Sequence, residues 1–357
     1  MKLLESSKMR LSLCIFFIIT FIYTVASVNM PCKLPIDYNM SQNIEKFSSK
    51  LYKEIPKRPK ENLLISPLAI GYLLSLFAIN STNESLDELS TVLDIHRNLI
   101  EKHYNCYLEI LNKDSTFNLS KGIISNDSTF RAEVTNKIQA TSLNIVNLNN
   151  YTVSISFNPK WEERYSVISS TKGTFFTSGL MNYYVTMLSL ESYFTHGNIS
   201  GIPASFIELP FKNDFYMLIV LPHEINGIES VEQSLGSLTI EEITRNNEKT
   251  HLDVNLPLFE IDVTTDVTQV LKKMGIQNLF NTNSEYLFRD VFKQNSYIRV
   301  KDSHGDDDSE NGGFSFIPIS LDSGKIYNIN RPFHYKIIKR YSSEENVVLF
   351  VGNVKSF

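Results

Sequence analysis

Residues Leu68 to Ile79 are apolar on nearly every side, and this segment constrains the fold more than any other. A helix at the surface of a domain carries one apolar stripe, so a helix that is apolar all round has to be enclosed by other elements. Pro67, directly before it, is a residue type favoured in the first turn of a helix. The chain has 357 residues, of which 42% are hydrophobic, and is long enough to build a core of the required size.

The first 27 residues have the layout of a secretory signal peptide. Lys2, Lys8 and Arg10 precede an apolar run from Leu11 to about Val25, and small residues follow it. The alternative is a membrane anchor, but the run is shorter than the roughly 20 residues of a membrane span. We expect cleavage near Ser27, leaving residues 28–357 as a single secreted domain without a membrane segment.

The mature chain has features typical of an extracellular protein. Loss of three basic residues and one acidic residue takes the formal net charge from −5 to −7, so there is no basic excess for nucleic acid. Cys32 and Cys106 remain, either as a disulfide or as two buried thiols. Glycosylation is predicted at the seven Asn-x-Ser/Thr sites, which are Asn39, Asn80, Asn83, Asn118, Asn126, Asn150 and Asn198.

Helix and strand patterns alternate irregularly along the chain, which predicts an α+β fold. Helices are expected around Ile44–Leu51, Leu68–Ile79, Leu99–Leu111, Phe130–Ala140, Ile228–Leu235 and Val267–Lys273. Strands are expected after Asn62 and at Phe117–Ile124, Leu143–Leu148, Phe206–Leu209, Tyr216–Leu221, His251–Val263, Phe333–Ile338 and Asn346–Val351. Residues 302–313 are acidic and glycine-rich and are predicted to be an exposed loop.

The sequence contains no complete catalytic, cofactor or metal motif, so an enzyme is not predicted. The seven histidines are scattered, without a His-x-x-x-His pair. Asp306, Asp308 and Glu310 alternate like calcium ligands, but Asn311 stands where an EF-hand needs glycine. The basic turn of Lys57, Arg58 and Lys60 is either a solvated connection or a contact for a glycosaminoglycan.

Five motifs occur in the order and spacing of one known family. They are Asn62-Leu-Leu-Ile-Ser-Pro-Leu-Ala-Ile; Phe157-Asn-Pro-Lys-Trp161; Glu208-Leu-Pro-Phe-Lys with Met217-Leu-Ile-Val-Leu-Pro-His-Glu; Leu256-Pro-Leu-Phe-Glu-Ile with Val270-Leu-Lys-Lys-Met-Gly-Ile; and Arg331-Pro-Phe with Val348-Leu-Phe-Val-Gly-Asn-Val. Over nearly the whole mature chain, the sequence resembles the serpins, the serine protease inhibitor superfamily.

The resemblance implies three β-sheets, a cap of helices and an exposed reactive-centre loop at about residues 302–330. It gives Asn62, Ser66, Pro67, Trp161, Pro332 and Phe333 structural roles. In inhibitory members, a protease cleaves the loop, whose hinge then enters the large sheet as a new strand and distorts the trapped enzyme. Counting from Gly305 at the hinge places the scissile bond after Ile319, between Ile319 and Ser320, with Leu321 as the next candidate. These residues suit an elastase-like or chymotrypsin-like pocket.

The hinge departs from the small, uncharged residues of the family pattern. With a side-chain period of two, Asp306, Asp308 and Glu310 share the face of the inserted strand that enters the core. Unpaired buried carboxylates each cost on the order of several kcal/mol, so insertion should stall. If the alignment slips by one residue at His304, Asp307 faces inward and Glu310 outward, and the penalty is smaller.

Two further departures concern the sheet itself. Val153 and Gln294 stand where the family has an asparagine and a histidine that help hold the sheet closed. The family helix that crosses the large sheet has no counterpart near Asn149 and Tyr151, through a real deletion or a mis-spliced gene model. The leading hypothesis is a secreted, monomeric family member that has lost or weakened protease trapping and acts on an unknown protein ligand. The rivals are a working inhibitor of an extracellular serine or cysteine protease, and an enzyme.

Overall fold

The computed structural model describes residues 40–78, 81–111, 117–124, 131–134, 150–162, 166–177, 182–236, 238–280, 291–301, 325–342 and 345–357. The helices are α2 (Met40–Glu54), α3 (Pro67–Ala78), α4 (Asn83–Leu93), α5 (Ile100–Leu111), α6 (Ile228–Leu235), α7 (Ile240–Thr244) and α8 (Thr268–Lys273), with 3-10 turns η1 (Arg97–Leu99) and η2 (Asn278–Phe280). The strands are β1 (Leu63–Ile65), β2 (Phe117–Ile124), β3 (Arg131–Val134), β4 (Asn150–Phe157), β5 (Ser166–Phe176), β6 (Asn182–Asn198), β7 (Ala204–Pro210), β8 (Phe215–Pro222), β9 (Asn247–Pro257), β10 (Phe259–Asp266), β11 (Val291–Val300), β12 (Lys325–Asn328), β13 (Phe333–Arg340) and β14 (Asn346–Val354).

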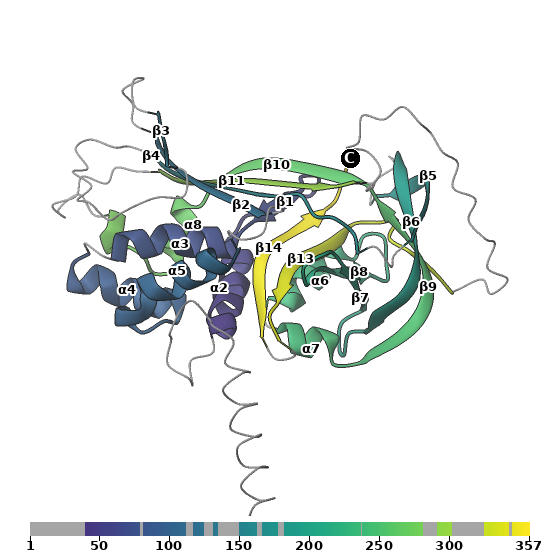
Figure 1. Ribbon diagram of the computed structural model, residues 1–357, viewed down its shortest axis with the longest axis horizontal. Coiled ribbons are helices and arrows are strands. Elements are labelled where there is room, and N and C mark those ends of the chain that lie inside the picture. Colours follow the sequence, from purple (N-terminus) through teal and green to yellow (C-terminus); the bar gives the residue numbers. More distant parts are fainter. Residues whose placement is uncertain are drawn as a thin grey trace, which may run out of the picture.

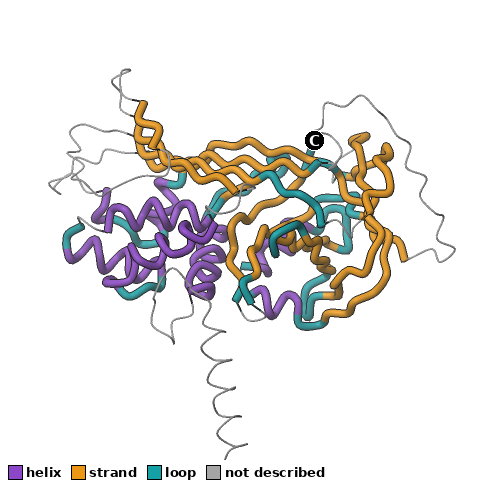
Figure 2. Tube along the Cα trace, in the orientation of Figure 1, coloured by secondary structure: helices purple, strands orange, loops and turns teal. Residues whose placement is uncertain are grey.

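The strands form two hydrogen-bonded sheets (Figures 1 and 2). One has five strands in the order β10-β11-β4-β2-β3. The other has nine, in the order β1-β14-β13-β8-β7-β6-β9-β12, with β5 paired to β6. The long β6 pairs with β9 along most of its length and with β7 at its end, so it joins two sheet-like parts. The described strands therefore form two continuous sheets where the resemblance implies three, because β6 pairs with both β7 and β9.

Helices α3, α4 and α5 gather under one face of the five-stranded sheet, as Figure 1 shows. The first nine residues of α3 are all buried, which confirms the central helix predicted from its apolar sequence. Its N-terminus begins as the sequence indicates, because the Ser66 Oγ accepts a hydrogen bond from the Ala69 backbone N–H at 3.2 Å, and Pro67 is the first helical residue.

Two sequence predictions are corrected by the strand assignments. The helix predicted over Phe130–Ala140 is wrong at its start, because Arg131–Val134 is strand β3, paired antiparallel with β2; residues 135–149, including the strand predicted at Leu143–Leu148, lie outside the described residues. The single strand predicted over His251–Val263 is two strands in different sheets. The chain leaves one sheet at Pro257 and enters the other at Phe259, while the Leu258 N–H is satisfied by the Thr186 carbonyl at 2.9 Å.

Candidate functional site: a closed seam beside the reactive loop

The described chain stops at Lys301 and resumes at Lys325, and both ends of this interval are fixed to the fold. The indole Nε1 of Trp161 donates a hydrogen bond to the Lys301 carbonyl at 2.9 Å. The Trp161 ring is 5% exposed and packs on Phe211, with ring centroids 4.7 Å apart. The only tryptophan of the chain therefore holds the residue from which the predicted hinge departs.

The C-terminal end of the interval belongs to the other sheet. Residues 325–328, which lie inside the predicted reactive loop, form strand β12, which pairs parallel with β9. The Tyr327 hydroxyl hydrogen-bonds the Ser205 Oγ at 2.7 Å, and burial raises the pKa of Tyr327 to about 12. The Asn255 amide donates to the Asn328 side-chain oxygen at 2.6 Å.

The motif Arg331-Pro332-Phe333 follows β12 and directs the chain into β13. The Arg331 Nε donates to the Pro222 carbonyl at 2.6 Å, whereas Pro332 and Phe333 are buried. The two ends of the predicted loop are therefore attached to different sheets. A loop held in this way can be cut without releasing either end from the fold.

The sheet next to the hinge contains one parallel pair among its described strands. Strands β4 and β11 run parallel in register from Asn150 opposite Val291 to Phe157 opposite Ile298, while the other described pairs of this sheet are antiparallel. A segment that turned back after β11 would run antiparallel to β11. If placed between β11 and β4 it would be antiparallel to both. The boundary between β4 and β11, called the seam below, is therefore where the topology accommodates one more strand.

The two residues predicted to replace the family asparagine and histidine lie opposite each other across this seam. Val153 and Gln294 are register partners, and both are 0% exposed. The Gln294 Oε1 accepts from the Ser66 backbone N–H at 3.0 Å, and its Nε2 donates to the Ser66 carbonyl at 3.1 Å. The glutamine therefore connects β11 to the start of α3, and Val153 supplies only apolar contact.

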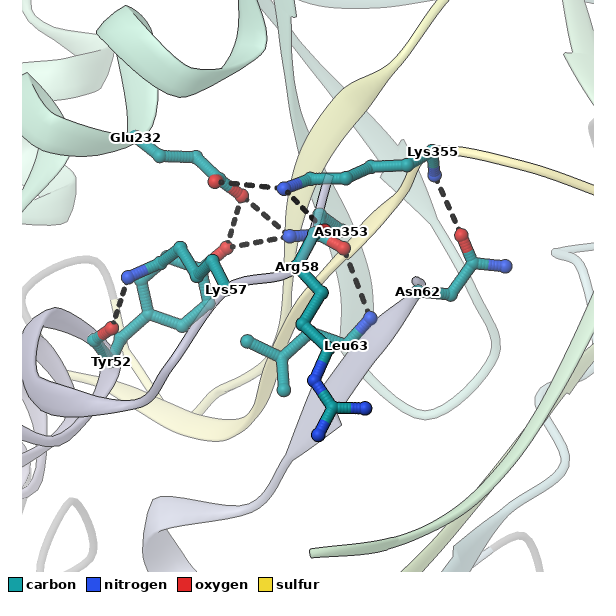
Figure 3. Close-up of polar contacts among 8 residues, drawn as sticks. All are labelled: Tyr52, Lys57, Arg58, Asn62, Leu63, Glu232, Asn353 and Lys355. Carbon is teal, nitrogen blue, oxygen red and sulfur yellow. Dashed lines mark hydrogen bonds and ion pairs between the residues drawn. The ribbon is translucent and has the colours of Figure 1, made fainter. Parts of the chain in front are cut away.

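A buried carboxylate, that of Glu232, contacts residues from the first described helix and from the C-terminal segment (Figure 3). The Glu232 carboxylate on α6 accepts hydrogen bonds from the Tyr52 hydroxyl at 2.5 Å and the Asn353 amide at 2.7 Å. Its other oxygen lies 3.6 Å from the Lys355 Nζ, and both charged side chains are 2% exposed. Asn62, from the first family motif, accepts the Lys355 backbone N–H at 2.7 Å.

The buried carboxylate was missed by the sequence reasoning, although a signal for it exists. Ile228, Val231, Glu232 and Leu235 have the spacing of one buried helix face, and all four are buried in α6. A glutamate at an apolar position of an amphipathic helix predicts a buried ionic partner. That partner, Lys355, lies 123 positions further along the chain, where no local pattern points to it.

Many of the predicted site residues lie outside the described residues. These are the hinge residues Gly305, Asp306, Asp308 and Glu310, the scissile candidates Ile319, Ser320 and Leu321, the signal segment, Cys32, and the sequon residues Asn39, Asn80 and Asn126. Asn118 and Asn150 lie in β2 and β4, and the Asn83 and Asn198 side chains are exposed. Cys106, on α5, is disulfide-bonded; pairing with Cys32 stays a prediction.

The described residues hold neither a metal-ligand cluster nor a membrane-spanning helix. No cluster of three or more His, Cys, Asp or Glu side chains is arranged to hold a metal ion there. Within the same part of the chain, no helix has the length and apolar character needed to span a membrane.

Comparison with known sequences identifies the family of the chain. The sequence model of one family, described as "Serpin (serine protease inhibitor)", matches residues 42–149 and 129–356. The chain belongs to the serpin family. The match falls in two pieces that overlap at residues 129–149, next to the position near Asn149 where the sequence predicts a gap relative to the family.

Individual relatives are distant in sequence and alike in fold. Alaserpin of Manduca sexta is 22% identical, over 90% of this chain and 96% of that protein. Intracellular coagulation inhibitor 1 of Tachypleus tridentatus is 27% identical, over 56% of this chain, but the match spans only about half of that protein, 50%. The crystal structure of Serpin48 from Tenebrio molitor has a TM-score of 0.69 at 23% identity, covering 91% of this chain and all of that one.

Proposed function

We propose that this chain is a secreted, glycosylated serpin that binds a protein ligand and traps proteases weakly or not at all. The predicted leader at residues 1–27, the disulfide-bonded Cys106 and the sequons support secretion. Asn83, at the start of α4, and Asn198, at the end of β6, are exposed, so the fold can accommodate glycans there. Expression in a secreting cell line, with N-terminal sequencing and glycosidase treatment of the medium, tests both points.

The observation that carries the proposal is the buried face of the seam next to an acidic hinge. On β11, Phe292, Gln294, Ser296 and Ile298 are at most 1% exposed. On β4, Val153, Ile155 and Phe157 are at most 2% exposed. Alternate residues of a strand entering between β4 and β11 would share this layer, and in the predicted register they are Asp306, Asp308 and Glu310.

The free energy of burying these carboxylates decides whether the hinge enters the sheet. Moving an unpaired carboxylate into such a layer costs on the order of several kcal/mol, and protonating it at pH 7 costs about 4 kcal/mol because its usual pKa lies near 4. Three such groups outweigh the backbone hydrogen bonds gained by the first inserted residues, at roughly 1 kcal/mol each. The hinge therefore stays in water, and a cleaving protease completes its reaction and leaves.

Incubation with elastase, chymotrypsin and cathepsins, followed by denaturing electrophoresis, tests this function. We expect cleavage of the loop without a band at the summed mass of protein and protease. An SDS-stable covalent complex formed at a near-stoichiometric ratio refutes the proposal. Mass spectrometry of the fragments locates the cut.

A working inhibitor is the second candidate, favoured by the activity that gives the family its name and by the apolar residues Ile319 and Leu321 in the loop. Cleavage after Ile319 or Leu321 together with a stable complex supports it. The variant Ile319→Arg distinguishes the two scissile positions, because it moves cleavage after residue 319 from elastase to a trypsin-like enzyme and leaves a cut after Leu321 in place.

A further inference from the structure

The solvent-facing side of the seam carries a row of hydrogen-bonded polar side chains. Thr264 on β10, Asn295 on β11 and Ser154 on β4 are register partners across three neighbouring strands. The Thr264 hydroxyl donates to the Asn295 Oδ1 at 2.9 Å, and the Asn295 Nδ2 donates to the Ser154 Oγ at 3.2 Å. The second of these bonds crosses the seam between β4 and β11.

On the buried side of the seam, the polar side chain of β11 makes no hydrogen bond to β4. Gln294 is adjacent to Asn295 and points to the opposite face, and its amide bonds to the Ser66 backbone rather than to β4. Its partner across the seam, Val153, has no hydrogen-bonding group in its side chain. Separating β4 from β11 therefore leaves the bonds of Gln294 intact, but it breaks the bond between Asn295 and Ser154.

We propose that Asn295 and Ser154 form an outer latch that sets how readily the β4–β11 seam opens. On the buried face, valine and glutamine stand opposite each other without a hydrogen bond between them, whereas on the solvent face the Asn295 amide bonds to Ser154 across the seam. Asn295 is a positioning residue, because its bond to Ser154 keeps β11 beside β4 and so limits entry of a further strand. The inference rests on the proposed function only in taking this seam as the place where a further strand would enter.

Amide hydrogen exchange of the intact, uncleaved protein tests the latch through the variants Ser154→Ala, Asn295→Leu and the double variant. One hydrogen bond of ordinary strength corresponds to about a fivefold change in a local opening equilibrium. We expect each single variant to speed exchange of the β4 and β11 amides about fivefold. Because both variants remove the same bond, the double variant should exchange about as fast as the faster single variant.

Two variants on the same outer face serve as controls. Thr264→Val removes the bond that Asn295 accepts from β10, and Tyr297→Phe removes the bond that the Tyr297 hydroxyl donates to the Glu260 carboxylate at 3.0 Å. Neither bond crosses the seam, so the β4 amides should exchange at the wild-type rate in both variants.

Three results overturn the latch: unchanged seam exchange in Ser154→Ala and Asn295→Leu, an equal rise in the distant pair β13–β14, or effects that multiply in the double variant. None of these measurements involves a protease. Their outcome is therefore independent of whether the protein traps one, and failure of the latch is separable from failure of the proposed function.

Discussion

Glu232 is a charged residue whose interactions are almost entirely internal. Its carboxylate holds Tyr52 and Asn353 by hydrogen bonds and pairs with Lys355, at 2% exposure on both sides. Removing one partner of a buried ion pair leaves the other charge uncompensated, which is far more harmful than never burying the pair. The residue is therefore a sensitive point for stability.

We expect Glu232→Gln to lower the free energy of unfolding by about 3 kcal/mol. The amide keeps the shape of the side chain but leaves the Lys355 ammonium buried without a counter-charge. Urea unfolding monitored by circular dichroism measures the loss. The matched control is Lys46→Gln, which removes the exposed Lys46–Asp94 pair and should change the free energy by less than about 1 kcal/mol. Equal effects of the two variants contradict the assignment.

Two buried histidines make stability depend on pH. Burial lowers the pKa of His103 to about 3 and, with the charges of Lys336 and Lys57, holds the pKa of His334 well below its usual value. His334 also lies edge-on to the Tyr52 ring at 4.8 Å. Both rings stay neutral in the fold but take up protons near pH 6.5 when unfolded, so their contribution to stability is lost as the pH falls below 6.5.

Between pH 7 and pH 5 the two histidines should together remove about 4 kcal/mol of stability. In a His334→Phe variant the pH-dependent loss should be smaller by about half of that amount, because of these two rings only His103 then takes up a proton on unfolding. Urea titrations at a series of pH values give the comparison. A variant with the full wild-type pH dependence would show that His334 is already protonated in the folded state.

At the scale of elements, one side chain on β11 makes hydrogen bonds to the start of α3. Gln294 satisfies both the N–H and the carbonyl of Ser66, which is 0% exposed. Gln294→Leu preserves volume and leaves the buried Ser66 N–H without a partner, whereas the Ser66 carbonyl keeps the Ile70 N–H at 3.1 Å, so we expect a loss of about 2 kcal/mol. Asn255→Leu, which removes an exposed amide bond to Asn328, should lose less than about 1 kcal/mol by the same unfolding measurement. A neutral Gln294→Leu variant would contradict this role.

Elements with strong local signals were predicted from the sequence. Helix α3 has its proline start and all-round apolar pattern, and α6 spans the predicted residues Ile228–Leu235. Helix α8 ends just before Gly275, whose φ of 110° suits glycine. In each of these cases the deciding information lies within a few residues of the element.

Elements whose structure depends on distant partners were not predicted. Arg131–Val134 is a strand because β2 pairs with it, and nothing within the segment itself excludes a helix. The polar strands β5 and β12 lack the apolar alternation of a half-buried strand. The break at Leu258 follows from the meeting of two sheets, which a continuous apolar pattern cannot reveal.

For the whole molecule, the hinge prediction concerns stability before and after cleavage. A serpin that inserts its loop gains a strand, whereas the acidic hinge here should leave the thermal midpoint nearly unchanged when the loop is cut. In the triple variant Asp306→Ala, Asp308→Ala and Glu310→Ala, cleavage should raise the midpoint by at least about 5 °C. Differential scanning calorimetry of intact and cut protein measures both.

Asp307→Ala is the matched control, because residue 307 faces outward in the predicted register. It should behave as the wild type. If Asp307→Ala gains stability on cleavage more strongly than Glu310→Ala, the register slips by one residue at His304. If the wild-type protein itself gains several degrees, the acidic hinge does not prevent insertion.

The candidate site was predicted from sequence only in part. Family motifs located Trp161, Ser66 and the pair Val153 and Gln294, and the structure places that pair opposite each other. The contact of Asn295 with Ser154 joins residues 141 positions apart, and no motif marks either of them. Cross-strand partners of this kind are set by register, which a single sequence does not contain.

Trp161 provides the molecule with its own optical reporter. The indole is the sole tryptophan of the chain, it is shielded from water, and its N–H is bonded to the carbonyl from which the loop departs. Any rearrangement that pulls Lys301 away exposes the ring or changes its hydrogen bond, and so shifts the intrinsic fluorescence of the protein. Cleavage, ligand binding and strand entry can therefore be followed in real time without attaching a dye.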